Sequence, residues 1–280
     1  MKATKSLYTL PWLLLFPFIA HAGDVPGTYA KYQWSSSVTG LTSVDYDINV
    51  QADPGYRANV RFANHFHLVG SSNGGYVGME DNARFGPNFV FTVRGATQYK
   101  AGDSGSRCVV YSGDNARVTC RIPNWSTVTE YQFHLAYEGG QWLGVTVTDV
   151  YNPKLVMKLG SILTDATSIS PQGMVSRTTY LEANSPNANC YNQPYSDVIF
   201  TPPTSNGVQA SISGTGTNTT CSYSSSVENW EQFNAGGNLL RGLYQGDDGL
   251  CVDAGNGHTN NVPATTQSCD KTKEAQAWVL

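Results

Sequence analysis

The chain has 280 residues, only 14% of them charged, and a formal net charge of -4 at pH 7. It is rich in glycine and tyrosine, with 28 and 16 residues respectively, a composition typical of turn-rich extracellular β proteins rather than helical cytosolic enzymes. The negative balance argues against a polyanion partner, and no basic stripe suggests binding to nucleic acid.

A secretory signal peptide is predicted for residues 1–22. Lys2 and Lys5 precede an apolar run over residues 10–19, and Ala20-His21-Ala22 forms a small-x-small cleavage site. The apolar run is shorter than the roughly 20 residues that a membrane span needs, and two prolines interrupt it. We therefore expect cleavage after Ala22, no membrane insertion of the mature chain, and a secreted or periplasmic location.

Period-two alternation dominates residues 29–181. Apolar and polar residues alternate over Val44–Val50, which predicts a strand with one buried face. Phe89–Val93 is more continuously apolar and should form a central strand. Two alternating runs flank Glu138-Gly139-Gly140 and predict a hairpin. With no sustained helical stripe, the predicted fold class is all-β, an antiparallel β-sandwich of jelly-roll or concanavalin-like type.

Residues 183–227 lose this alternation and are rich in Asn, Ser, Pro and Gly. Two interpretations remain open: a disordered linker, or an extension held by a disulfide with short strands such as Val198–Phe200. A domain boundary is expected near Val227.

The cysteines form an even set in an exported chain, which indicates disulfides. Sequence proximity favours the pairs Cys108–Cys120, Cys190–Cys221 and Cys251–Cys269. A metal cluster is disfavoured because no two cysteines have the C-x-x-C spacing usual in zinc sites. We expect no metal and no other cofactor.

A sugar-stacking face is a hypothesis for the sandwich, because sugars present apolar C–H faces and many hydroxyl groups to aromatic and planar polar side chains. The aromatic candidates are Trp34, Tyr76, Tyr99, Trp125 and Trp142. Taken singly, each ring fits packing in the core better, so the hypothesis requires the rings to be coplanar. Trp125 and Trp142 are kept as candidate carbohydrate-binding residues.

Two kinds of titratable residue could support metal binding or glycoside hydrolysis. His65 and His67 lie two apart, so a strand would point both to one face, but solvated strand residues explain them better than a metal site does. Paired carboxylates for glycoside hydrolysis need a separation of about 5–10 Å. The sequence does not select such a pair among Asp45, Asp47, Glu80, Glu138, Asp149 and Glu182.

Residues 74–80, Gly-Gly-Tyr-Val-Gly-Met-Glu, begin a series of segments with a characteristic order. The series continues in Phe89–Val93, in Trp125 ahead of Tyr131-Gln132-Phe133, in the Trp142 hairpin and in Tyr180-Leu181-Glu182. It resembles the exported bacterial family known as DUF3472 over about 150 residues. The resemblance implies a sandwich for residues 23–182 and brings no agreed activity.

The C-terminal segment combines Gly249-Leu250-Cys251-Val252-Asp253, Cys269 and Gln276-Ala277-Trp278. This pattern is similar to one repeat of the ricin-type lectin family, which implies a small, partial β-trefoil-like unit over residues 228–280. In that family a carboxylate at the position of Asp253 binds two sugar hydroxyls, and an amide beside the glutamine at the position of Gln276 completes the site.

The ricin-like segment departs from the family pattern in its site and in its repeat number. Gln267 stands where a stacking aromatic is expected, and Ala275 stands at the amide position. Gln276 then fits a hydrogen-bonding role within the repeat, and Asp253 could also cap a turn. Because a trefoil normally needs three repeats, the segment is a degenerate remnant, one third of a shared trefoil, or a truncated sequence.

Together these features predict a secreted lectin-like protein that recognises extracellular or cell-surface glycans through Asp253, Gln276, Trp142 and Trp125. Its partner would be a glycan or polysaccharide and not a nucleic acid, and oligomers are possible. One alternative is a glycan hydrolase or lyase with carboxylates on the sandwich, although no catalytic motif supports an enzyme. Another is a structural or adhesive envelope protein.

Overall fold

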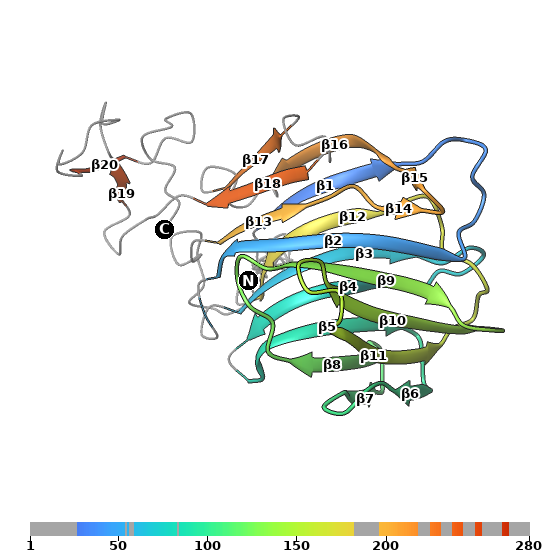
Figure 1. Cartoon of the computed structure of the whole chain (residues 1–280). Coiled ribbons are helices and arrows are strands. Elements are labelled where there is room, and N and C mark those ends of the chain that lie inside the picture. Colours follow the sequence, from blue (N-terminus) through green and yellow to red (C-terminus); the bar gives the residue numbers. More distant parts are fainter. Residues whose placement is uncertain are drawn as a thin grey trace, which may run out of the picture.

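The computed structural model describes residues 27–53, 55, 59–82, 84–181 and 196–217, with the backbone alone of 225–230, 237–242, 250–253 and 265–268. These residues form an all-β sandwich of two antiparallel sheets (Figure 1). Within this described part, no helix is long and apolar enough to cross a membrane.

The first sheet has eight strands. In spatial order they are β16 (Ser211–Thr217), β1 (Gly27–Gln33), β12 (Val175–Tyr180), β3 (Val60–His67), β4 (Gly74–Asn82), β5 (Gly86–Arg94), β8 (Arg117–Pro123) and β7 (Arg107–Tyr111).

The second sheet has ten strands. Its main path runs through β17 (Ser225–Trp230), β18 (Gly237–Gly242), β13 (Asp197–Phe200), β2 (Ser43–Ala52), β9 (Glu130–Tyr137), β10 (Trp142–Asp149), β11 (Val156–Leu163) and β6 (Tyr99–Ala101). The short strands β14 (Thr204–Ser205) and β15 (Val208–Gln209) join it beside β2, and β19 (Leu250–Asp253) pairs with β20 (Thr265–Ser268) separately.

The core lies between the two sheets and confirms the strand predictions. In β2, Val44, Tyr46, Ile48 and Val50 are buried while the intervening residues are partly exposed. Phe89 of β5 meets Phe133 of β9 across the core, with ring centroids 5.9 Å apart. The predicted hairpin is β9–β10, and Val198–Phe200 lies in strand β13.

Strand β4 is buried along nearly its whole length, on both faces of the eight-stranded sheet. One face packs in the core through Val77 and Met79. The opposite face carries Tyr76 and Glu80, which long side chains of the neighbouring strands cover. This second face is therefore a layer of polar side chains that cover the buried residues of β4.

The region after residue 196 extends both sheets. Strand β16 continues the eight-stranded sheet beside β1, and β13 pairs with β2 in the ten-stranded sheet. The boundary predicted near Val227 falls inside β17, which pairs with β18 and through it with β13. The backbone hydrogen bonds of residues 225–230 and 237–242 thus join these two strands to the sandwich.

Candidate functional site

The outward face of the eight-stranded sheet gathers the side chains of a candidate site. Because alternate residues of a strand share a face, the ladder places Arg61 opposite Glu80 and His65 opposite Tyr76. On the same face, the pairing of β5 with β8 places Arg94 directly opposite Arg117. The buried cluster of Ala63, Tyr76 and Val90 forms the floor of this face.

Two adjoining pockets open on this face, with volumes of about 480 and 430 Å³. Arg61 and Arg117 line both, so the pockets form one groove along the strands. We call it the arginine groove. Its lining includes Arg61, Tyr76, Glu80, Asn82, Arg84, Phe85, Thr92, Arg94, Tyr111, Asp114, Arg117 and Arg121.

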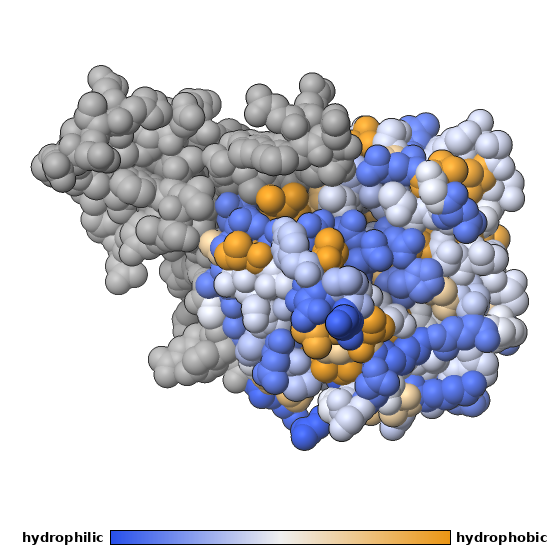
Figure 2. All heavy atoms as spheres, viewed as in Figure 1, coloured by the Kyte–Doolittle hydropathy of each residue, from blue (hydrophilic) through white to orange (hydrophobic). Residues whose placement is uncertain are grey.

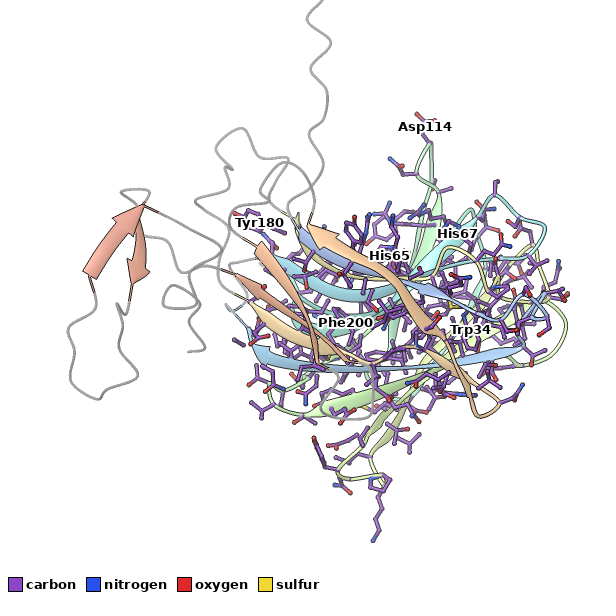
Figure 3. The ribbon with its side chains drawn as sticks, turned by 90° about the horizontal axis from the view of Figure 1, so that it is seen from above. Trp34, His65, His67, Asp114, Tyr180 and Phe200 are labelled. Atoms are coloured by element: carbon purple, nitrogen blue, oxygen red, sulfur yellow. A yellow bond between two sulfur atoms is a disulfide. The ribbon has the colours of Figure 1, made fainter. Side chains whose placement is uncertain are left out.

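One wall of the groove is the hairpin of β7 and β8. Figure 3 shows Asp114 at its tip, away from the body of the sandwich. The disulfide Cys108–Cys120 joins the two strands of this hairpin. The Arg117 guanidinium donates a hydrogen bond to the Asn115 carbonyl oxygen over 3.2 Å. The hairpin is therefore cross-linked by this hydrogen bond near its turn and by the disulfide farther along its strands.

Glu80 is clamped at one end of the groove. Its side chain is 1% exposed, and its oxygens accept hydrogen bonds from Arg61 Nε at 3.3 Å and Arg121 Nε at 2.7 Å. Asn82 Nδ2 donates a third bond over 2.9 Å. Because both oxygens of Glu80 are engaged, this carboxylate organises the arginines rather than standing open to a ligand.

Several guanidinium groups of the groove stack on aromatic rings. Arg61 lies over the Tyr76 ring at 4.2 Å, Arg117 over Tyr111 at 4.2 Å, and Arg121 over Phe85 at 4.8 Å. Stacking of this kind restricts the long side chain before any ligand arrives. The donors of the groove are therefore pre-organised.

His65 lies on the same face as the groove arginines, and its pKa is lowered. Burial lowers its pKa most, and the positive charges of Arg177, Arg61 and Arg94 lower it further, to about 3. The imidazole therefore stays neutral at physiological pH. Its ring lies 5.5 Å from Tyr76, and its buried Nε2 has no hydrogen-bond partner.

The groove is positive although the chain is negative. Among its lining residues the five arginines, at positions 61, 84, 94, 117 and 121, face two carboxylates, Glu80 and Asp114, which leaves three net positive charges. The formal charge of the whole chain is -4. The groove is thus opposite in charge to the chain as a whole.

Comparisons with known proteins assign no family to the chain. No family model matches the chain, and no curated protein matches it either. Among solved structures, it is similar to scytalido-glutamic peptidase with a transition state analog inhibitor, at 11% identity and a TM-score of 0.42, over 79% of this chain and 98% of the other. It is also similar to SCP-B, a member of the Eqolisin family of peptidases, at 10% identity and a TM-score of 0.41, over 78% of this chain and all of the other. Similarity this low assigns neither an activity nor a residue role.

The predicted sugar-stacking face is not formed. Trp34 and Trp125 are buried at 6% and 5% exposure, because both pack in the core between the sheets. Trp125 also donates from Nε1 to the Glu80 carbonyl oxygen. Trp142 lies on the outer face of the ten-stranded sheet under the Lys100 amine, 4.0 Å away, whereas Tyr76 lies in the arginine groove on the other sheet. The rings therefore share no plane.

The other predicted residues are dispersed. Asp45 pairs with His134 on the ten-stranded sheet, where Glu138 contacts Lys158 and Ser161. That face, seen in Figure 2, mixes hydrophilic and hydrophobic residues. His65 and His67 do share a face, but His65 is covered rather than solvated.

Several predicted residues cannot be placed. The backbone of Asp253 and Cys251 is described in β19, but their side chains are not. Gln276, Glu182, Cys190, Cys221 and Cys269 lie outside the described residues. The first predicted disulfide, Cys108–Cys120, is confirmed.

A close carboxyl pair, missed at the level of sequence, lies away from the groove lining. Asp53 and Asp81 are hydrogen-bonded to each other, and each retains a buried Oδ1 without a partner. Burial, and then Asp53 itself, raise the pKa of Asp81 to about 7. The two residues are 28 positions apart in sequence, so no local pattern could have joined them.

The groove arginines were also missed. In β8 the outward residues are Arg117, Thr119 and Arg121, and alternation alone would have put them on one face. What the sequence does not reveal is that β3, β4, β5 and β8 are neighbours. Strand order brings the arginines together.

Proposed function

We propose that this protein binds a polysaccharide along the arginine groove. The observation that carries the proposal is the groove itself: two adjoining pockets, walled by strands and lined with planar donors that aromatic rings already hold in place. An elongated, open groove suits a linear polymer better than a compact metabolite, because a polymer can occupy both pockets at once.

The lining matches the surface of a sugar chain. Hydroxyl groups of sugars donate and accept hydrogen bonds. Guanidinium groups donate to them, and amide and hydroxyl side chains both donate and accept. Asn73 and Thr92 line one pocket and Asn82 the other. The disulfide Cys108–Cys120 supports the exported location in which extracellular glycans would be met.

A binding role fits the carboxylates better than glycoside hydrolysis does. Hydrolysis needs one carboxyl group as acid and a second as base or nucleophile at the same bond. In the groove, Glu80 has both oxygens bound by Arg61, Arg121 and Asn82. The Asp53–Asp81 pair, which has the raised pKa expected of an acid, does not line either pocket.

The first test is a glycan array with an insoluble-polysaccharide pull-down, using the mature chain from Gly23. Arg117→Ala removes a cation that lines both pockets of the groove. Lys154→Ala removes a cation from an exposed turn elsewhere, and Asp253→Ala removes the carboxylate of the ricin-like segment. Binding that is lost with Arg117→Ala and kept in the other two supports the groove. Loss with Asp253→Ala alone would move the site to the C-terminal segment. No binding to any glycan would contradict a carbohydrate-binding role and favour a structural one.

A further inference from the structure

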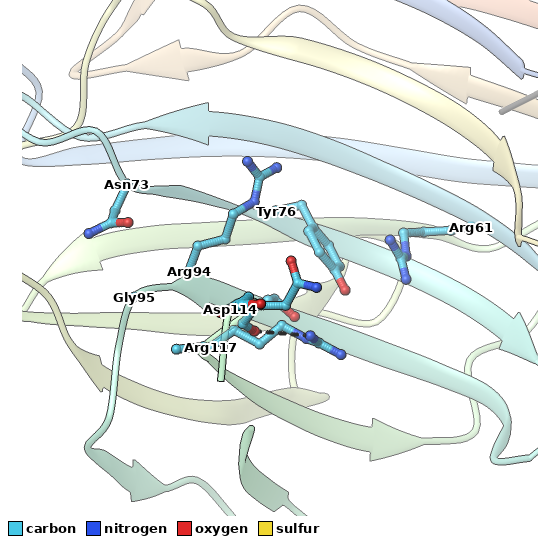
Figure 4. Close-up of a pocket in the computed structure, with 10 residues that line it drawn as sticks. Arg61, Asn73, Tyr76, Arg94, Gly95, Asp114 and Arg117 are labelled. Atoms are coloured by element: carbon cyan, nitrogen blue, oxygen red, sulfur yellow. Dashed lines mark hydrogen bonds between the residues drawn. The ribbon is translucent and has the colours of Figure 1, made fainter. Parts of the chain in front are cut away.

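One pocket of the groove keeps like charges side by side. Arg94 and Arg117 are directly opposite each other on β5 and β8, an arrangement that destabilises a sheet unless something neutralises it. Arg61 lines the same pocket of about 480 Å³, and Figure 4 shows all three arginines with Tyr76. We call this part of the groove the Arg94 pocket. Asp114, on the hairpin turn, is the one acidic residue of its lining.

Most donors in the Arg94 pocket have no partner. A guanidinium offers five N–H donors. Within the described part of the chain, Arg94 makes no hydrogen bond and no ion pair, and Arg117 makes a single bond, to the Asn115 carbonyl. Arg61 reaches Glu80 through Nε alone, which leaves its terminal nitrogens available. Glu80 thus engages Arg61 and Arg121 at the far end of the groove, whereas Arg94 has no carboxylate partner among the described residues.

The arginines at this end of the groove also act on His65. Three arginines, Arg177, Arg61 and Arg94, add to burial in holding the His65 pKa far below its usual range, and no carboxylate acts in the opposite direction. The pocket therefore has the shape, the donors and the field of an anion site.

We propose that the Arg94 pocket binds the acidic group, a carboxylate or sulfate, of an acidic polysaccharide. This proposal rests on the function proposed above and names its ligand class. Carboxylate and sulfate both present coplanar oxygens that a guanidinium can bind in a bidentate manner. The stacked, planar arginines bind such oxygens with little further loss of side-chain freedom.

A sugar acid fits this site better than the phosphates of a nucleic acid. The five arginines lie in one groove of a chain whose formal net charge is -4. A nucleic acid carries a phosphate at every nucleotide, so most of its charges would lie outside the groove. A flexible chain with spaced acidic groups can place one group in the Arg94 pocket and its neutral sugars along the rest.

The test uses two matched pairs of polymers with the mature chain. Polygalacturonate is compared with its fully methyl-esterified form, and dextran sulfate with dextran, so that only the charge changes within a pair. The variant is Arg94→Gln, an exposed side chain whose loss leaves the core intact, and the control is Lys154→Gln, which makes the same charge change on a distant turn. An oligonucleotide of similar charge serves as competitor.

We expect the charged member of at least one pair to bind about tenfold or more tightly than its neutral partner, and which pair does so tells carboxylate from sulfate. Arg94→Gln should weaken that binding about tenfold and reduce its dependence on salt, while Lys154→Gln should change neither. Equal binding of charged and neutral members would overturn the acidic subsite and leave the glycan function standing. Tighter binding of the oligonucleotide would overturn the ligand class, and no binding to any glycan would overturn both proposals.

Discussion

At the scale of single residues, Glu80 is the side chain whose charge does most to order the groove. It is buried between Arg61 and Arg121, so removing its charge leaves two partly buried guanidiniums without their counter-ion. We expect Glu80→Gln to cost about 3 kcal/mol of unfolding free energy. The matched change Glu138→Gln breaks the more exposed pair with Lys158 and should cost less than about 1 kcal/mol. Urea unfolding of both variants checks this, and equal losses would contradict it.

The Asp53–Asp81 pair should make stability depend on pH. The ordinary pKa of an aspartate side chain is 3.8. In the folded chain, burial and the neighbouring Asp53 raise the pKa of Asp81 to about 7. The folded state therefore favours the protonated form, so this pair destabilises the protein progressively as the pH rises from about 4 to about 7. Asp81→Asn should reduce that slope, because only Asp53 with its own raised pKa then remains, and should raise stability at pH 8 by about 1 to 2 kcal/mol. Thermal unfolding measured from pH 4 to pH 8 decides, and a flat wild-type profile would contradict the prediction.

Residue chemistry was only partly readable from the sequence. The cross-strand disulfide Cys108–Cys120 followed from proximity, because its partners lie 12 residues apart. The sequence leaves Trp125 as a candidate sugar platform that fits core packing better, and its indole does lie in the core, where its N–H donates to the Glu80 carbonyl oxygen. Composition cannot tell a buried tryptophan from an exposed one, since both have the same chemistry.

At the scale of elements, the β7–β8 hairpin controls one wall of the groove. It carries Tyr111 and Arg117, and the Cys108–Cys120 disulfide ties its strands together beside the core. We expect Cys108→Ala with Cys120→Ala to lower stability by about 3 kcal/mol, the loop-closure value for a loop of this size. Glycan binding should fall as well, because β7 is an edge strand with a neighbour on one side only.

Hydrogen exchange distinguishes a local effect from a global one in this double variant. Protection should be lost first in β7 and β8, while β3 and β4 remain protected under native conditions. Unchanged exchange in β7 together with unchanged binding would show that the disulfide does not hold the wall.

Element prediction succeeded where local patterns decide and failed where pairing does. The alternation in β2 and the Gly139-Gly140 turn between β9 and β10 are properties of a few adjacent residues, so both were predicted correctly. Arg94 and Arg117 meet only because β8 returns to pair with β5 after β6 and β7 have intervened. The sequence of a single strand does not predict which distant strand it pairs with.

At the scale of the whole molecule, the net charge and the local charge of the groove differ in sign. A formal charge of -4 argued against a polyanion, yet the arginine groove carries three net positive charges. Total charge governs solubility and long-range repulsion, whereas a binding site responds to the charges within about one Debye length, roughly 8–10 Å. Where the charges gather is a property of the fold.

The sequence predicts a domain boundary near Val227, and strand pairing continues on both sides of that residue. Strand β18 covers the edge of β13 and β17 covers β18, so a chain ending at Val227 would cut β17 and expose β13. Exposed edges lose hydrogen bonds and promote association between molecules. We expect the chain ending at Val227 to unfold several degrees below the full mature chain and to aggregate, whereas a chain ending at Gly242 keeps both strands and should elute as the full chain does. Calorimetry and size-exclusion chromatography compare the three, and identical unfolding temperatures would instead make residues 228–280 an independent unit.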